Sequence, residues 1–276
     1  MRPRLRTFLA HAALVALAAV YVAPILFMVV GSLKPDARVL AEAGSLRAFL
    51  PTEASFQNYR DVFRRVAFGR FLLNSLVVTG SIVLGGLVVN SLAGYAFARL
   101  RWTGRDAVFL LVLVLLILPY EAIAVPLFYQ VSLLGWRDTY LVQILPFVAN
   151  ALSIYLFYSF FLGLPRELED AARVDGAGTL RTFWEVVVPN SRPVFATVTI
   201  VTFLFFWGFF LWPQLVTSGP DVRPLPVAIA TFHTLPPLQW GDILAFGVMM
   251  VAPVLLVFLL FQRWFVRGIA STGTKG

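Results

Sequence analysis

The residue types that carry out most protein chemistry are scarce in this sequence. Cysteine is absent, which excludes disulfides, thiolate metal ligands and cysteine nucleophiles. The two histidines, His11 and His233, lie far apart in the chain, and neither an HExxH cluster nor a GxxxxGKS or GxxxxGKT phosphate loop occurs. We therefore predict that this chain has no catalytic residue and no metal site, and that it does not hydrolyse ATP by itself.

Polar side chains inside the apolar runs are the remaining places for chemistry. Glu121 is the only charged residue in the run from Ala107 to Leu134, and a charge at membrane depth marks a functional site by default. Because Pro119 and Pro126 flank it and proline interrupts helices, we favour a helix end that places Glu121 near solvent.

Two further polar sets have both a functional and a structural interpretation. Asn90 is either a substrate ligand or a hydrogen-bonding contact between helices, and we favour the contact. Asn150, Ser153 and Tyr155 lie along one apolar run and either line a pathway or pack inside a helix bundle. Packing is the favoured interpretation here too, because polar side chains in membranes usually pair with each other.

A polar segment, Leu164–Pro193, lies between two long apolar runs and carries the signals of two short helices. Pro165 suits the first position of a helix, and Gly176 suits a left-handed C-terminal stop. Thr179 is the predicted N-cap of the second helix, which Pro189 closes.

Both predicted helices have an apolar face. Leu168, Ala171 and Ala172 follow helical spacing, so one face of the first helix is small enough to lie close to another surface. The stripe of the second helix consists of Leu180, Phe183, Trp184, Val187 and Val188. Ordered amphipathic loops are common in membrane proteins, so docking of a partner and simple packing at the interface both remain open from these residues alone.

The composition is that of a membrane protein. Of 276 residues, 59% are hydrophobic and 13% are charged, and the mean hydropathy is +0.83, which is unlike a soluble domain. The net charge of +8 comes from arginines that flank apolar runs rather than from basic patches with interleaved aromatic residues. We therefore expect anionic lipid headgroups, and not nucleic acid, to be the partner of these charges.

Six apolar runs predict an all-α, polytopic membrane protein that forms a single transmembrane domain over residues 1–276. A membrane crossing needs about 20 apolar residues. The N-terminal run is longer than the core of a signal peptide, so we expect it to be a retained span. The expected spans are residues 8–31, 71–98, 107–131, 140–163, 194–217 and 243–262.

Charge asymmetry predicts the orientation of these spans. An even number of crossings places both termini on one side, and the arginines before the first span, between Arg99 and Arg105, and after the last span then share that side. Positive charge marks the cytoplasmic side. We expect both termini and residues 164–193 to be cytoplasmic.

The run ELEDAARVDGAGTLRTFWEVVVPNSRP resembles the EAA motif of inner-membrane permease subunits in binding-protein-dependent ABC importers. The matching positions are Glu169, Ala171, Ala172, Asp175, Gly176, Phe183, Pro189 and Pro193. Other stretches look like the carbohydrate-uptake branch of that family. They are SFQNYRDVF at 55–63, NSL at 74–76, AGYAFARLRWTGRD at 93–106, ALSIYLFYSFF at 151–161 and the terminal FQRWFVRGIASTGTKG.

Two departures from the family pattern are visible. The triplet that gives the motif its name reads Asp170-Ala171-Ala172, which keeps the charge. Trp207-Gly208 stands where members of this branch often carry Trp-Asn, which weakens any transfer of pathway chemistry from residue to residue.

The resemblance implies a coupling helix that docks into a groove of a separate ATPase subunit. The ATPase-coupling residues would be Glu169, Asp170, Ala171, Ala172, Asp175, Gly176 and Ala177. The implied partners are a second homologous permease chain, two ATP-binding subunits that use ATP and Mg, and an extracytoplasmic solute-binding protein. This chain would bind no cofactor.

The implied function is import of a sugar or sugar-like solute across a bacterial or archaeal cytoplasmic membrane. Asn150, Ser153, Tyr155 and Glu121 are the candidates for lining the pathway. A self-sufficient secondary transporter or channel is the alternative, but it predicts an ionisable relay at the membrane midplane, and Glu121 is the only charge in the spans. An intramembrane enzyme would require paired His or Asp residues inside the spans, and none occur.

Overall fold

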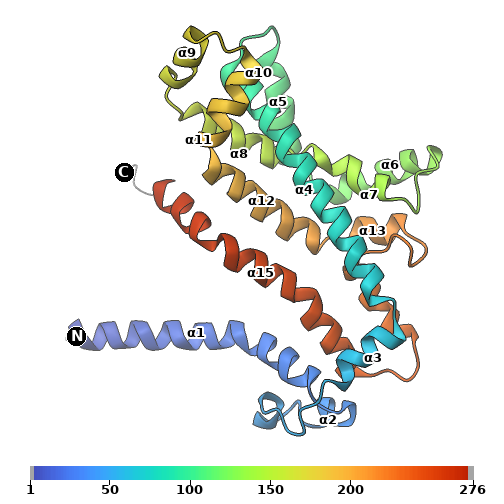
Figure 1. The fold of residues 1–276 in the computed structure, drawn as a ribbon. Coiled ribbons are helices and arrows are strands. Elements are labelled where there is room, and N and C mark those ends of the chain that lie inside the picture. The colour runs from blue at the N-terminus through green and yellow to red at the C-terminus, as the bar shows by residue number, and fades with distance from the viewer. Residues whose placement is uncertain (1–2, 273–276) are drawn as a thin grey trace. The chain divides into compact units, whose positions relative to one another are not determined.

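The computed structural model describes the backbone of residues 3–272 and the side chains of residues 7–260. This part of the chain is all-helical and contains no strand (Figure 1). It divides into two compact units, residues 1–69 with 228–253 and residues 70–227 with 254–276. The expectation of a single transmembrane domain over residues 1–276 stays a prediction. The side chains of the N-terminal arginines and of the terminal stretch FQRWFVRGIASTGTKG lie outside the described residues.

The first unit combines a long N-terminal helix, a structured polar loop and the beginning of the last helix. Its elements are α1 (Pro3–Ser32), α2 (Asp36–Ala41), η1 (Leu46–Phe49), α3 (Gln57–Arg65), η3 (Ile229–Thr234) and the first part of α15 (Trp240–Thr272). Asn58 closes the end of α1 by donating to the carbonyls of Ser32 and Lys34, each at 2.8 Å. The buried ammonium of Lys34 donates to Glu42 at 2.7 Å, which holds the pKa of Glu42 below its usual range.

Arg65, the last residue of α3, attaches this loop to the start of α15. Its guanidinium donates to Asp242 at 2.6 Å and to the carbonyls of Leu235 and Pro237 at 3.0 and 2.6 Å. Asp242 is fully buried, and a buried carboxylate needs such a partner because removal from water is costly. Several charge-assisted hydrogen bonds therefore fix the polar loop on α15.

The second unit contains residues 164–193, called the coupling segment after their predicted role, and the bundle that supports them. Its elements are α4 (Phe68–Arg99), α5 (Arg105–Leu115), α6 (Tyr120–Leu133), α7 (Tyr140–Val148), α8 (Ala151–Leu162), α9 (Glu167–Val174), α10 (Thr179–Thr182), η2 (Phe183–Val187), α11 (Val188–Asn190), α12 (Arg192–Trp207), α13 (Leu211–Val216) and α14 (Leu225–Ala228). η2 is a π-helical turn.

Within the described residues, four helical stretches are long and apolar enough to cross a membrane. They are Thr7–Ser32, Phe68–Arg99, Tyr140–Leu162 and Trp240–Leu260. Two bent pairs, α5 with α6 and the 179–190 stretch with α12, raise this number to six if each pair counts as one span. An all-α polytopic architecture is thus confirmed.

The third expected span, residues 107–131, is two helices rather than one. α5 and α6 meet at a bend of 102°, and Pro119 is the N-cap residue of α6. Pro119 has no N–H to continue the helix, and it disfavours helical backbone at the residue before it. Pro126 lies inside α6, so only Pro119 lies at a helix boundary.

Small residues on α4 allow α7 and α8 to approach its backbone. A Cβ at Gly94 would lie 3.0 Å from the amide nitrogen of Tyr158 and 3.1 Å from the carbonyl of Ile154. Asn90 lies one turn before Gly94 on α4. Its side chain donates to the carbonyl of Val148 at 3.0 Å and accepts from the amide of Asn150 at 2.9 Å. The prediction that Asn90 makes an interhelical hydrogen bond is confirmed, and its side chain bridges the break between α7 and α8.

Candidate functional site: the segment between α8 and α12

α9 ends at the predicted glycine. Gly176 has φ +77°, and its amide donates to the carbonyl of Arg173 at 3.0 Å while the amide of Ala177 donates to that of Ala172 at 2.9 Å. This pair of bonds is the Schellman arrangement, which satisfies the last carbonyls of a helix. The start differs from the prediction: Arg166 is the N-cap residue, so Pro165 precedes the helix instead of opening it.

The second helix begins as α10 and continues through the π turn η2 into α11. The predicted N-cap, Thr179, is wrong by one residue. Gly178 is the N-cap residue, with φ −72° and ψ 166°, and its carbonyl accepts the first helical hydrogen bond, from Thr182 at 2.9 Å. Pro189 lies inside the last turn, and Ser191 separates that turn from α12.

The apolar stripe of this second helix is divided between two environments. Phe183 and Val187 are fully buried in a core formed with α4, α8 and α12. Leu180 and Trp184 remain exposed on the segment. The inner part of the stripe therefore packs on neighbouring helices, and a position of its exposed part at the membrane interface stays a prediction.

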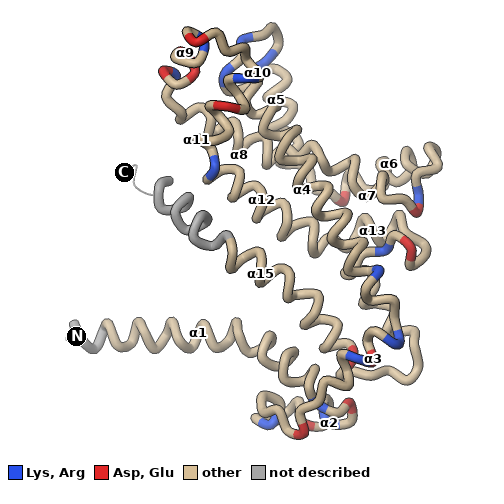
Figure 2. The backbone as a smooth tube through the Cα atoms, in the orientation of Figure 1, with Lys and Arg blue, Asp and Glu red and all other residues tan. Residues whose placement is uncertain are grey.

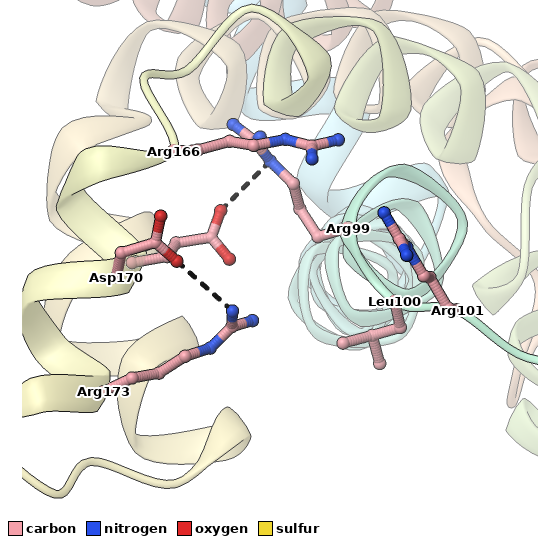
Figure 3. A pocket seen from close by; sticks show the side chains of 7 residues that line it. Arg99, Leu100, Arg101, Arg166, Asp170 and Arg173 are labelled. Atoms are coloured by element: carbon pink, nitrogen blue, oxygen red, sulfur yellow. Dashed lines mark hydrogen bonds and ion pairs between the residues drawn. The ribbon is translucent and has the colours of Figure 1, made fainter.

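Glu169 is the one residue of α9 that is buried. Its carboxylate forms an ion pair with the Nε of Arg99 at 3.0 Å, and the two side chains are 6% and 4% exposed. The hydroxyl of Tyr95 donates to the other carboxylate oxygen at 3.0 Å. Arg99 also donates to the carbonyl of Leu164. Figure 3 shows the arginine reaching across to this carboxylate from the end of α4.

A polar cavity of about 360 Å³ lies beside this ion pair. Its lining residues are Arg99, Leu100, Arg101, Arg166, Glu169, Asp170 and Arg173 (Figure 3). Asp170 pairs with Arg173 at 3.4 Å on the exposed surface. Among the described residues, Arg101 and Arg166 have no ion-pair partner. The cavity wall is therefore basic, with the two carboxylates each already paired.

Residues 7–260, whose side chains the structure describes, leave the face of α9 opposite Glu169 uncovered. Leu168 and Ala171 are exposed, Val174 is 88% exposed, and Ala172 is half-buried. Asp170 and Asp175 are exposed beside them. Figure 2 shows acidic and basic residues gathered at α9, whereas most of α12 is uncharged. A short helix thus presents small and apolar side chains with acidic neighbours.

The predicted pathway residues have different surroundings. Asn150 is the N-cap residue of α8, and its side chain accepts from the amide of Ser153 at 3.0 Å. Ser153 is buried and donates to the same oxygen at 3.2 Å. Tyr155 is exposed on α8. Glu121 is exposed in the first turn of α6, so the predicted helix end is confirmed, and its position near solvent stays a prediction.

Sequence reasoning missed the roles of Tyr95 and Arg99. Arg99 was counted only among the charges of a basic turn, and Glu169 only among the coupling residues. The available signal was position: Arg99 is the first charge after the uncharged run 71–98, and an arginine there is well placed to pair with an acid of a nearby segment. Nothing in the sequence indicated which acid.

Residues 86–271 match the family described as "Binding-protein-dependent transport system inner membrane component". The chain belongs to this family of inner-membrane permeases. The matched region of the permease includes the end of α4, the whole coupling segment and α12.

Named relatives are similar to most of the permease. It is 33% identical to the "Arabinooligosaccharides transport system permease protein AraQ" of Halalkalibacterium halodurans, over 96% of this chain and 94% of the relative. It is 38% identical to the "sn-glycerol-3-phosphate transport system permease protein UgpE" of Yersinia pestis, over 74% of each chain.

A solved structure shares the fold of the permease. It is described as a "bacterial ABC transporter involved in the import of the acidic polysaccharide alginate", and it superposes with a TM-score of 0.84 over 95% of this chain and 97% of that chain, at 23% identity. The permease therefore has the fold of an ABC importer subunit. Its family consists of transport components of the inner membrane.

Proposed function

We propose that this permease is the membrane-spanning subunit of an ATP-driven, binding-protein-dependent importer for a sugar or sugar-like solute. It forms the translocation pathway with a second homologous permease chain. The names of its relatives, which concern arabinooligosaccharides and sn-glycerol-3-phosphate, support a polyhydroxylated solute. An extracytoplasmic solute-binding protein delivers that solute, as the family description implies.

The observation that carries this proposal is the two-sided character of α9. Its inner side is anchored by Glu169, and its outer side presents Leu168, Ala171 and Val174, which the described part of the chain leaves exposed. Small side chains allow another backbone to approach closely, and exposed apolar side chains gain free energy when a partner covers them. Two ATP-binding subunits, which hold ATP and Mg, dock on this face of the two permeases.

The orientation belongs to the same proposal. The permease lies in a bacterial or archaeal cytoplasmic membrane with both termini and α9 on the cytoplasmic side, where ATP is available. Arg101, Arg166 and Arg173 near α9 agree with the excess of positive charge expected there. The membrane itself supplies the lipid contacts of the exposed apolar helices.

Tyr155 and Glu121 are our remaining candidates for pathway lining. Asn150 and Ser153 already use their polar groups to begin α8. Within the described residues, neither the side chain of Tyr155 nor that of Glu121 forms a hydrogen bond or ion pair. Free polar side chains can contact hydroxyl groups of a passing solute.

The test is purification of the permease from its native membrane in a mild detergent, with mass spectrometry of the proteins that remain bound. We expect a second six-span chain and an ATPase that carries a phosphate loop. The ligand of the co-purified binding protein then gives the solute. Recovery of the permease alone, from a preparation that still transports, would contradict the proposal and favour a secondary transporter or channel.

A further inference from the structure

We propose that Tyr95, Arg99 and Glu169 form a joint that transmits the movement of α9 to α4. In this proposal Glu169 is a positioning residue: it holds α9 against α4 and does not contact the ATPase. This inference rests on the proposed function, because it requires that an ATPase moves α9. It assigns different roles to the adjacent acids Glu169 and Asp170.

The joint connects the ends of three helices. Arg99 is the last residue of α4, and its guanidinium reaches Glu169 of α9 and the carbonyl of Leu164, two residues beyond α8. Tyr95, one turn earlier on α4, donates to Glu169 at 3.0 Å. Both carboxylate oxygens of Glu169 therefore interact with α4, one through a charge and one through a hydrogen bond.

A buried ion pair adds little to the stability of a protein, but it can fix the relative position of two elements. Removing two charges from water costs several kcal/mol per ion, and apolar side chains of similar size often stabilise a protein equally well. A charge pair, however, has one favourable arrangement and cannot slide without separating the charges. It therefore fixes the register of α9 on α4 while α9 is pulled.

The neighbouring surface pair provides a contrast. Asp170 and Arg173 lie on α9 itself, and their side chains are mostly exposed. Such a pair contributes little to stability and cannot transmit force between elements. Asp170 thus remains free to face a partner, whereas Glu169 connects α9 to the membrane helices.

The coupling segment has a second, independent attachment. Phe183 and Val187 are buried against α4, α8 and α12. The ring centroids of Phe183 and Tyr95 lie 5.2 Å apart. This apolar contact holds the segment on the bundle when the ion pair is absent. A variant that removes only the charge of Glu169 is therefore expected to fold and to assemble.

The experiment compares Glu169→Gln with wild type in the complete importer, reconstituted in vesicles with its binding protein. Glutamine keeps the shape and can still accept from Tyr95, but it leaves the guanidinium of Arg99 unpaired. We expect solute uptake per ATP hydrolysed to fall by about tenfold, within the range of coupling free energies between sites, while the ATPase remains bound. The exchange Arg99→Glu with Glu169→Arg should restore part of the ratio.

The matched control is Glu185→Gln. Glu185 also pairs with an arginine of the same segment, Arg181 at 2.9 Å, but both side chains are exposed. This control should keep the wild-type ratio of uptake to hydrolysis. Tyr95→Phe removes one hydrogen bond and keeps the ion pair, so it should lower the ratio less than Glu169→Gln does.

Different outcomes would contradict the proposed joint and the proposed function. A wild-type complex without an ATPase would contradict the proposed function. A coupled wild-type complex in which Glu169→Gln keeps the full ratio would overturn the joint. A parallel fall of uptake and hydrolysis in both Glu169→Gln and Tyr95→Phe would also overturn it, because a merely structural role lowers both rates together.

Discussion

Gly94 is the residue whose lack of a side chain matters most to the packing of α4. A Cβ there would lie 2.6 Å from the Cβ of Phe157 and within 3.1 Å of two backbone atoms of α8. Backbone atoms in a helix cannot move away individually, so the helices themselves would have to separate. Glycine is thus required at position 94 by direct contact between α4 and α8.

The variant Gly94→Ala should destabilise the permease by about 1–3 kcal/mol, the usual cost of overpacking. Thermal unfolding in detergent measures the effect. Gly80→Ala is the matched control, since Gly80 lies on the same helix with nothing within 4 Å of its added Cβ. A control that unfolds as early as Gly94→Ala would show that glycine on α4 serves another purpose.

Gly176 is required by its backbone angle rather than by space. Nothing lies within 4 Å of an added Cβ, but φ is +77°. Gly176→Val should cost about 1–3 kcal/mol in local strain, which shifts the end of α9.

For Gly176→Val, we expect the ATP hydrolysis of the reconstituted importer to continue while uptake falls. Gly178→Ala, at a φ of −72°, should keep both, and unchanged uptake in Gly176→Val would refute the role.

Asp138 makes one local contact sensitive to pH. Its carboxylate accepts from the amide of Ser218 at 2.5 Å, and this bond, before any other cause, lowers the pKa of Asp138 below its usual value. The stabilisation is therefore complete above the unfolded-state pKa and is lost as the pH falls through the lower folded-state pKa. Hydrogen exchange at Ser218, corrected for its intrinsic rate, should lose protection in acid. Asp138→Asn should remove that pH dependence.

Among the elements, α9 illustrates what the sequence can predict. Its glycine stop and its small outer face follow from local residue types, and both are observed. The burial of Glu169 could not be predicted, because its partner Arg99 is distant in the chain and the choice of acid depends on how α9 folds back on α4. The break between α5 and α6 was indicated by Pro119, but nothing in the sequence gave the bend of 102°.

The docking face of α9 can be tested with added bulk. Ala171 is exposed on the outer face, so Ala171→Trp should prevent the close approach of an ATPase and reduce its recovery in a pull-down. Ala43→Trp, in the exposed turn after α2, is the control for a large side chain elsewhere. A complex that forms normally with Ala171→Trp would show that another face docks.

At the scale of the whole molecule, the absence of cysteine makes orientation easy to measure. Single variants Leu46→Cys and Leu180→Cys place one thiol in the first polar loop and one in the coupling segment, at positions that are 85% and 67% exposed. In spheroplasts, a maleimide that cannot cross membranes should label Leu46→Cys only. Labelling of Leu180→Cys alone would reverse the proposed orientation.

The ion pair of Arg99 and Glu169 also constrains how such permeases can be recombined. A coupling segment transplanted from one permease to another brings its acid but not the arginine at the end of the recipient's α4. Either charge without its partner would be buried alone, at a cost of about 3–5 kcal/mol. Functional chimeras should therefore be those whose recipient helix ends in a matching base, and a reversal of charge at one of the two positions should require the opposite reversal at the other.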